Sequence, residues 1–455
     1  MFPVDIARPL SGVKLLGGAV SHDLNFCKDM AMRRVMKTTE LMCAIRKLRD
    51  PQCEMLLLRA CSGVSKLYYA FRTSAPIVFS DASKVFDTAL RESVESIVTD
   101  GRAGFGAWQW RQATMPIKHG GLGLYTAADT LKFAYTASRL QSMPLQNQIL
   151  NNSGIFEFGF ALDSALQAFK AVIGSNVFDY DVVTPAPQLM KAMAGLCYNK
   201  IDKDIASVYS LSTRELALWS NLKLPHVQDW LLVIPVNGLN QTMEPRAYRS
   251  VLQYRMGIEI FRGVDKCPSC DRVILDKWGD HALMCASDYG IKHRHNHVRD
   301  TLYDLCFIAG ISSKKEAGIG LVDGKGGELR PADVLLYNWE DGRSTCIDVT
   351  VTAPFCSIGT DNFVAGEACT VASQKKKKKY VTACEGLGYN FVSFAVSTIG
   401  DMDSEATQLL TRIHRFLASC EGGSRLAMHV FSRIAFAVQR GCGAQLACML
   451  PSFSV

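Results

Sequence analysis

Residues 267–285 read CPSCDRVILDKWGDHALMC, and the spacing within them decides how the second half of the chain is interpreted. Cys267 and Cys270 form a Cys-x2-Cys turn, which brings two thiolates to one metal ion. His281 and Cys285 follow as a His-x3-Cys pair, which a helix places on one face. Four such ligands favour tetrahedral zinc and leave no open position. We therefore predict a structural Zn²⁺ site; buried cysteines beside a surface histidine are the alternative.

Beyond this segment the sequence pattern changes to short β-rich runs that alternate with helices. Strands alternating with helices imply an α/β layer. The expected strands are 333–337, 345–352 and 391–397, and the expected helices are 297–307, 367–384 and 404–419.

Two aspartates accompany the first two of these strands. Asp348 lies inside the apolar run 346–351, and Asp333 directly follows Arg330-Pro331-Ala332. A carboxylate within an apolar strand is costly unless it is paired or binds a metal ion. Two carboxylates on neighbouring strands could hold Mg²⁺ and activate water against a phosphodiester. Alternatively, Asp333 belongs to a turn at the strand start and Asp348 to a structural ion pair.

Five consecutive lysines, 375–379, supply positive charge close to these carboxylates in the chain. On a helix that begins at Glu367, Lys376 shares a face with Ala368, Ala372, Tyr380 and Cys384. Lys376 is therefore expected to point at the sheet, while neighbouring lysines meet phosphate. A solvated helix face is the alternative for the run. Glu316 is a further candidate metal-site carboxylate, with a surface ion pair as its alternative.

The first 145 residues have a helical pattern. Apolar residues recur at helical spacing over 24–49, and Asp50-Pro51 reads as an N-cap with proline at the first helical position. A glycine-rich segment near residue 120 permits close backbone approach or positive φ. Trp108 before it is expected to pack in the core; stacking on a base is the alternative.

Composition places limits on the class of protein. The net charge of +7 favours nucleic acid only modestly. The chain holds 16 cysteines without an apparent secretory signal, so we read them as reduced thiols. We also find no run of about 18 apolar residues that would span a membrane. An intracellular, soluble protein is expected.

The order of these motifs resembles the C-terminal region of non-LTR (LINE-type) retrotransposon reverse transcriptase/endonuclease polyproteins. Members of that family with a restriction-like endonuclease carry a GGLGL segment, a Cys-Cys-His-Cys zinc motif, an Arg-His-Asn segment and a PD-(D/E)XK nuclease domain. The matching residues here are Gly120-Gly121-Leu122-Gly123-Leu124; Cys267, Cys270, His281 and Cys285; Arg294-His295-Asn296; and Asp333, Asp348, Lys376 and Lys379. The resemblance covers most of the chain.

The resemblance implies a domain order and site roles. The domains would be a helical thumb-like region (1–145), a helical linker (146–260), a zinc module (261–297), an α/β nuclease (298–420) and a helical tail (421–455). The catalytic residues would be Asp333, Asp348, Lys376, Lys379 and Glu316, with Asp333 and Asp348 binding Mg²⁺. The nucleic-acid-binding residues would be Arg294, His295, Asn296, Lys375, Lys377 and Lys378. Two departures stand out: Ala332 separates Pro331 from Asp333, and Thr350 occupies the usual lysine position.

The implied function is nicking of target DNA by Mg²⁺-dependent hydrolysis, in the nucleus, with target DNA and element RNA as partners. No Tyr-x-Asp-Asp or Phe-x-Asp-Asp sequence is present, so a polymerase domain would come from upstream or in trans. A non-catalytic nucleic-acid-binding remnant is one alternative. A host protein that keeps the fold for protein contacts is another.

Overall fold

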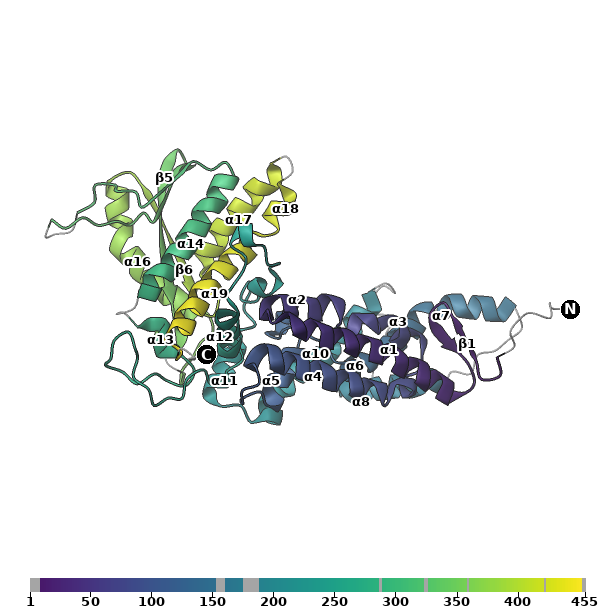
Figure 1. Cartoon of the computed structure of the whole chain (residues 1–455). Helices are drawn as coiled ribbons and strands as arrows, with labels where there is room; N and C mark the ends of the chain where they lie inside the picture. Colours follow the sequence, from purple (N-terminus) through teal and green to yellow (C-terminus); the bar gives the residue numbers. More distant parts are fainter. Residues whose placement is uncertain are drawn as a thin grey trace. The chain divides into compact units, whose positions relative to one another are not determined.

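The computed structural model describes residues 9–152, 160–174, 188–285, 289–322, 326–357, 360–420 and 423–451. The chain divides into two compact units (Figure 1). The first unit comprises Met1–Gly101, Gly106–Pro116 and Gly121–Ser210, and the second comprises Arg102–Phe105, Ile117–Gly120 and Leu211–Val455. The described residues form mostly helices, with one small four-stranded sheet and a two-stranded hairpin.

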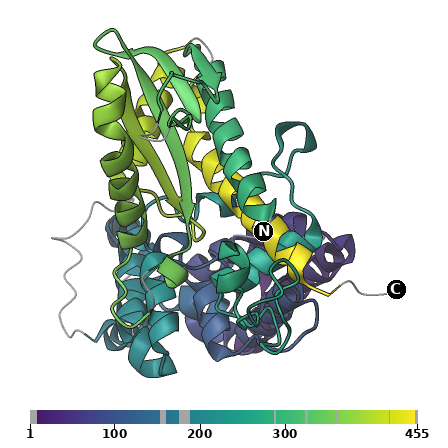
Figure 2. The same ribbon diagram turned by 90° about the vertical axis from the view of Figure 1, so that its left-hand side faces the viewer.

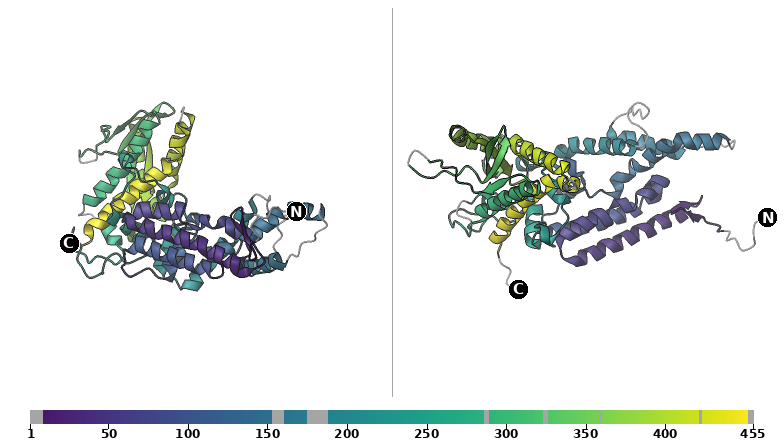
Figure 3. Two further views of the ribbon diagram at one scale, coloured as in Figure 1. Left: turned by 45° about the vertical axis from the view of Figure 1, so that its right-hand side comes forward. Right: turned by 90° about the horizontal axis from the view of Figure 1, so that it is seen from above.

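The described part of the first unit contains helices and a short hairpin of β1 (Val13–Leu15) and β2 (Gly18–Val20). Its two long early helices, α1 and α4, run side by side (Figure 3). The described helices are α1 (Leu24–Ile45), α2 (Pro51–Cys61), α3 (Tyr68–Thr73), α4 (Ala82–Thr99), α5 (Ala107–Thr114), α6 (Ala127–Leu131), α7 (Ala134–Asn152), α8 (Phe160–Ile173) and α10 (Leu189–Tyr209).

Helical spacing of apolar residues builds the core of this unit. In α4, Phe86, Leu90 and Val94 recur four residues apart and are fully buried. The carboxylate of Asp50 accepts from the backbone N–H of Gln52 at 3.0 Å, and Pro51 opens α2, which confirms the predicted cap. The predicted boundary at residue 145 is wrong, because it falls inside α7 and the unit continues to Ser210.

The glycine-rich segment makes the close backbone approach that its sequence predicts. A Cβ on Gly121 would lie 2.0 Å from the carbonyl oxygen of Met115, so only glycine fits there. Gly123 has φ +71° and donates its N–H to the same carbonyl at 3.0 Å. Trp108 is only 8% exposed and lies beside Tyr209, which confirms core packing.

The second unit contains a four-stranded sheet in the order β3-β4-β5-β6. Its strands are β3 (Ser313–Lys315), β4 (Val334–Glu340), β5 (Arg343–Thr352) and β6 (Asn390–Ser397). Its helices are α11 (Thr213–Asn221), α12 (Pro245–Arg255), α13 (Asp280–Met284), α14 (Tyr289–Ile308), α15 (Pro354–Ser357), α16 (Glu367–Gly386), α17 (Ser404–Ser419), α18 (Ser424–Ala427) and α19 (Val430–Met449). The expected α/β alternation after the zinc motif is confirmed.

The sheet is mixed. β3, β4 and β5 pair antiparallel, whereas β5 and β6 pair parallel, with Asp348 opposite Ser393. A parallel pair requires a crossover connection, and α16 provides it. Figure 2 shows α16 on one side of the sheet and α14 on the other. Side chains at alternate positions of β5 therefore face different helices.

Two predicted domain boundaries are also wrong. The boundary at 297/298 falls inside α14, so the zinc motif and the sheet belong to one unit. The predicted tail contains α19, which packs along α12 and α14 as part of this unit. Among the described residues, no helix is long and apolar enough to cross a membrane.

Candidate metal centre and carboxylate cluster

The predicted zinc ligands lie together in the second unit. The sulfur atoms of Cys267 and Cys285 are 3.7 Å apart, and Cys270 Sγ lies 3.6 Å from His281 Nε2. All four ligand atoms lie within 4.8 Å of one another. Metal–ligand bonds typical of zinc give tetrahedral edges of about 3.8 Å between sulfurs and about 3.6 Å between sulfur and nitrogen. The donor set and its geometry could hold a metal ion, consistent with zinc.

A tight turn arranges the first two cysteines. The N–H of Cys267 donates to Val273 O, and the N–H of Asp271 donates to Cys267 O, both at 2.8 Å. Asp271 adopts φ +50°, which aspartate tolerates better than most residues. Backbone N–H groups of Arg272 and Val273, with His281, lower the pKa of Cys270 to about 6. Cys270 is therefore disposed to be the thiolate that a metal requires.

Asp276 positions the helix that carries His281. Its Oδ1 accepts from the N–H groups at the start of α13, and its Oδ2 accepts from the N–H of His281 at 2.7 Å. Asp280, the first residue of α13, accepts hydrogen bonds from the guanidinium of Arg214 and from the hydroxyl of Tyr254, both at 2.9 Å. Sequence reasoning missed Asp276, Arg214 and Tyr254. Of these three residues, only Asp276 had a sequence signal: an aspartate just before a short helix is a common capping residue.

The second cluster centres on Asp348 in the middle of β5. Asp348 is only 4% exposed, and Lys376 Nζ lies 2.7 Å from its Oδ2. The contact is a close ion pair between the ammonium and the carboxylate. Lys376 comes from α16, and Tyr380 and Cys384 of the same helical face are buried. The structure thus confirms that Lys376 points at the sheet.

Asp333 lies beside this pair. Its Oδ2 accepts from the N–H of Val349 at 2.7 Å and lies 3.1 Å from His295 Nε2. Burial raises the pKa of Asp348, and the charge of Asp333 raises it further, against Lys376 and His295. Burial lowers the pKa of His295, but the hydrogen bond to Asp333 and its charge prevail, so the net shift is upward. These couplings place two carboxyl groups, one lysine and one histidine in one electrostatic site.

Glu316 does not join the carboxylates as a metal ligand. It follows β3 with φ +47°, and its N–H donates to Asp333 O at 2.9 Å. Its side chain turns away and forms an ion pair with Arg299. The ion-pair alternative for Glu316 is therefore the one observed, because the nearby guanidinium holds the carboxylate outside the cluster.

Arg294, predicted to bind nucleic acid, is buried instead. It is 1% exposed, and it donates to Gln445 Oε1 at 2.7 Å and to Leu283 O at 3.1 Å. These bonds connect α14 to α19 and to the zinc-ligand helix α13. The prediction is wrong, because a guanidinium enclosed by protein cannot reach a phosphate. Its neighbour Asn296 is exposed, as expected for a binding residue.

The remaining lysines of the run have different surroundings from Lys376. Lys377 forms an ion pair with Glu405 at 2.6 Å, so part of its charge is already balanced. Lys379 lies over the ring of Tyr380, with its Nζ 4.6 Å from the ring centroid. Lys375, Lys378 and Lys379 are exposed. Only Lys376 of this run contacts Asp348 among the contacts that the structure describes.

A comparison with protein-family models gives no match to this chain, and a comparison with curated proteins gives none either.

Proposed function

We propose that the second unit is a metal-dependent DNA endonuclease module, like that of the retrotransposon polyproteins whose motif order it resembles. The observation that carries the proposal is the buried Asp348 next to Asp333, with Lys376 reaching it from the crossover helix. A buried carboxylate such as Asp348 is costly to maintain, and a carboxylate whose pKa is perturbed in this way is more common at functional sites than elsewhere.

The position of Lys376 supports this proposal further. Thr350 stands on β5 where the simplest nuclease motif has its lysine, and a lysine from the following helix takes the vacant role. Its ammonium can orient a water molecule and stabilise negative charge that develops on a phosphoryl group. His295, beside Asp333, can hold or deliver a proton at the same site.

Mg²⁺ is the cofactor that the proposal requires, and Asp333 and Asp348 would hold it. Among the described residues no third acidic, histidine or cysteine ligand completes a cluster with them. Mg²⁺ accepts such a site, because it commonly keeps waters and takes phosphate oxygens with only one or two carboxylates. A bound Mg²⁺ would polarise the scissile phosphate and lower the pKa of a bound water.

The other parts of the chain would serve binding. Exposed Lys375 and Lys378, with Asn296, would contact the phosphates of target DNA. The proposed Zn²⁺ would hold the segment 267–285 in its folded form. The helical first unit would act as the thumb-like region that contacts element RNA, beside a polymerase domain from upstream or in trans. A nuclear site of action follows from DNA as the target.

The test is nicking of supercoiled plasmid by the full chain with added Mg²⁺. Asp348→Asn and Asp333→Asn should each abolish nicking while the protein stays folded. Asp341→Asn is the matched control, because Asp341 is an exposed carboxylate in the hairpin that joins β4 to β5. If both Asp348→Asn and Asp333→Asn nicked the plasmid at the wild-type rate, the proposal would be refuted.

A non-catalytic nucleic-acid-binding protein is the second candidate, and one observation favours it. Both carboxylates already have a basic neighbour, His295 for Asp333 and Lys376 for Asp348, which is the pattern of a structural network. This candidate requires salt-sensitive binding of DNA without cleavage in any divalent metal. Negligible affinity for DNA and RNA would instead indicate a host protein that keeps the fold for protein contacts.

A further inference from the structure

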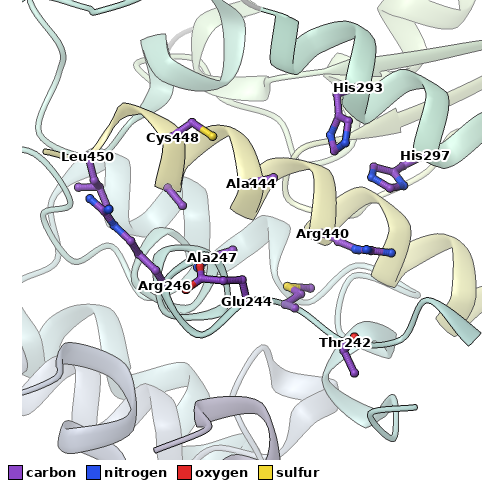
Figure 4. A pocket seen from close by; sticks show the side chains of 12 residues that line it. Thr242, Glu244, Arg246, Ala247, His293, His297, Arg440, Ala444, Cys448 and Leu450 are labelled. Atoms are coloured by element: carbon purple, nitrogen blue, oxygen red, sulfur yellow. The ribbon is translucent and has the colours of Figure 1, made fainter. Parts of the chain in front are cut away.

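A cavity of about 790 Å³ lies beside α14, and His293 and His297 of this helix line it (Figure 4). His295 of α14 contacts Asp333, whereas His293 and His297 of the same helix line the cavity. Residues two apart on a helix face nearly opposite directions, which separates the two sites. The start of α12 and the last turns of α19 form the other walls.

The polar lining is predominantly cationic. Arg440 of α19 and Arg246 of α12 both line the cavity and are half-buried. Arg440 donates to the neutral carbonyl oxygen of Asn240 at 3.5 Å, and Arg246 donates to that of Pro451 at 2.6 Å. The carboxylate of Glu244, which also lines the cavity, accepts from the N–H of Ala247 as the cap of α12. Arg440 therefore offers guanidinium charge to an anion that enters the cavity.

The histidines add donors and acceptors near Arg440. The rings of His293 and His297 are perpendicular, with centroids 4.3 Å apart. Burial, then the charges of His293 and Arg440, lower the pKa of His297 to about 4. His297 is thus neutral near pH 7 and can hydrogen-bond an anion without adding charge. A cationic metal ion is disfavoured there, because Arg440 lies beside the imidazole.

One wall of the cavity is apolar and shallow. Ala444, Ala447 and Leu450 of the α19 segment line it, with Ala247 and Met243 from the α12 side. Small side chains leave room for a flat ring against the helix. The volume lies within the range of pockets that bind small organic molecules, and it exceeds the needs of a lone inorganic ion.

From these features we propose that the cavity binds a nucleoside phosphate, with the phosphate at Arg440 and the base against the alanines of α19. Arginine matches phosphate oxygens through its planar fork of donors. The same chemistry is offered by a free mononucleotide and by the end of a single-stranded nucleic-acid chain. This inference does not rest on cleavage by Asp333 and Asp348, which do not line the cavity.

The test is calorimetric titration of the zinc-loaded full chain, without added Mg²⁺, with AMP and with a 5′-phosphorylated single-stranded oligonucleotide. Arg440→Gln should weaken binding of either probe about tenfold or more, because a charge-assisted hydrogen bond is lost. Arg433→Gln is the matched control: it removes one positive charge from α19 at a residue outside the cavity lining, and should leave affinity within about twofold.

A second variant tests the same cavity independently, in case Arg440→Gln misfolds. Ala444→Leu fills the cavity without changing charge and should abolish binding of both probes. Tighter binding of the oligonucleotide than of AMP would identify a chain end as the ligand, and tighter binding of AMP would identify a free nucleotide. No binding of either probe to the wild-type chain at millimolar concentration would overturn the proposal. So would equal weakening by Arg433→Gln and Arg440→Gln, which would indicate general charge attraction.

Discussion

Lys376 Nζ lies 2.7 Å from Asp348 Oδ2, although one residue belongs to a crossover helix and the other to the centre of a sheet. The carboxylate is nearly fully buried, and the lysine is about one-third exposed. This contact connects the stability of the second unit to its proposed chemistry, since the same ammonium balances Asp348 in the folded protein and would meet the substrate.

Replacement of Lys376 should therefore destabilise the fold in a pH-dependent way. Lys376→Met leaves Asp348 buried without its counter-charge and should cost about 2 kcal/mol at pH 7. The folded-state pKa of Asp348 is raised, so Asp348 becomes protonated as the pH falls through that pKa. Protonation removes the buried negative charge that destabilises the variant. Urea unfolding at pH 7 and at about pH 5 should show a smaller loss at the lower pH. Adding Asp348→Asn should recover most of it.

Lys378→Met is the control for this series, because Lys378 is exposed on the same helix. Its unfolding free energy should stay within about 0.5 kcal/mol of wild type. If Lys376→Met behaved in the same way, the ion pair would have no energetic role.

Removal of one zinc ligand should release the metal and weaken the second unit. Cys267 is fully buried, and Cys267→Ser replaces a thiolate by a hydroxyl that binds zinc poorly. Purified wild type should contain about one zinc per chain by elemental analysis, and the variant close to none. Cys43→Ser, at an exposed cysteine, should retain the metal and the melting temperature. Full zinc content in Cys267→Ser would contradict the ligand assignment.

The contact between His295 and Asp333 should make stability depend on pH near neutrality. The folded-state pKa of His295 is raised above its ordinary value of 6.5, so its contribution is fully present below pH 6.5. That contribution is lost as pH rises through the folded-state pKa. The difference in unfolding free energy between wild type and His295→Gln should therefore shrink from about pH 6 to about pH 9. His22→Gln, at an exposed histidine, should show no such trend.

Close packing around Arg294 should make Gly441 intolerant of a side chain. A Cβ at Gly441 would lie 2.9 Å from the Cα of Arg294, between α19 and α14. Gly441→Ala should therefore cost about 1–3 kcal/mol in thermal or urea unfolding, despite the better helix propensity of alanine. Gly195→Ala in α10 meets no atom within 4 Å and should stabilise by about 0.5–1 kcal/mol. Equal effects would show that the helix contact is loose.

Much of the second unit can be predicted from local sequence patterns. The spacing of the zinc ligands, the three later strands and the face of α16 that carries Lys376 all depend on short-range periodicity, and the structure bears them out. The burial of Arg294 could not be predicted in this way, because it depends on Gln445 of α19, which lies 151 residues further along the chain. The ion pair between Arg299 and the carboxylate of Glu316 likewise joins two separate elements, α14 and the end of β3. A contact between segments far apart in the chain cannot be inferred from the local sequence of either segment.

Helix α14 contributes consecutive side chains to separate tasks: His293 and His297 to the cavity, Arg294 to α13 and α19, and His295 to Asp333. Each residue added to or deleted from a helix rotates the remainder of that helix by about 100°. A one-residue deletion between His293 and His297 would move these side chains out of phase with one another, and no single compensating substitution could restore them. An insertion or deletion in this turn of α14 should therefore disrupt the second unit more than any point substitution there.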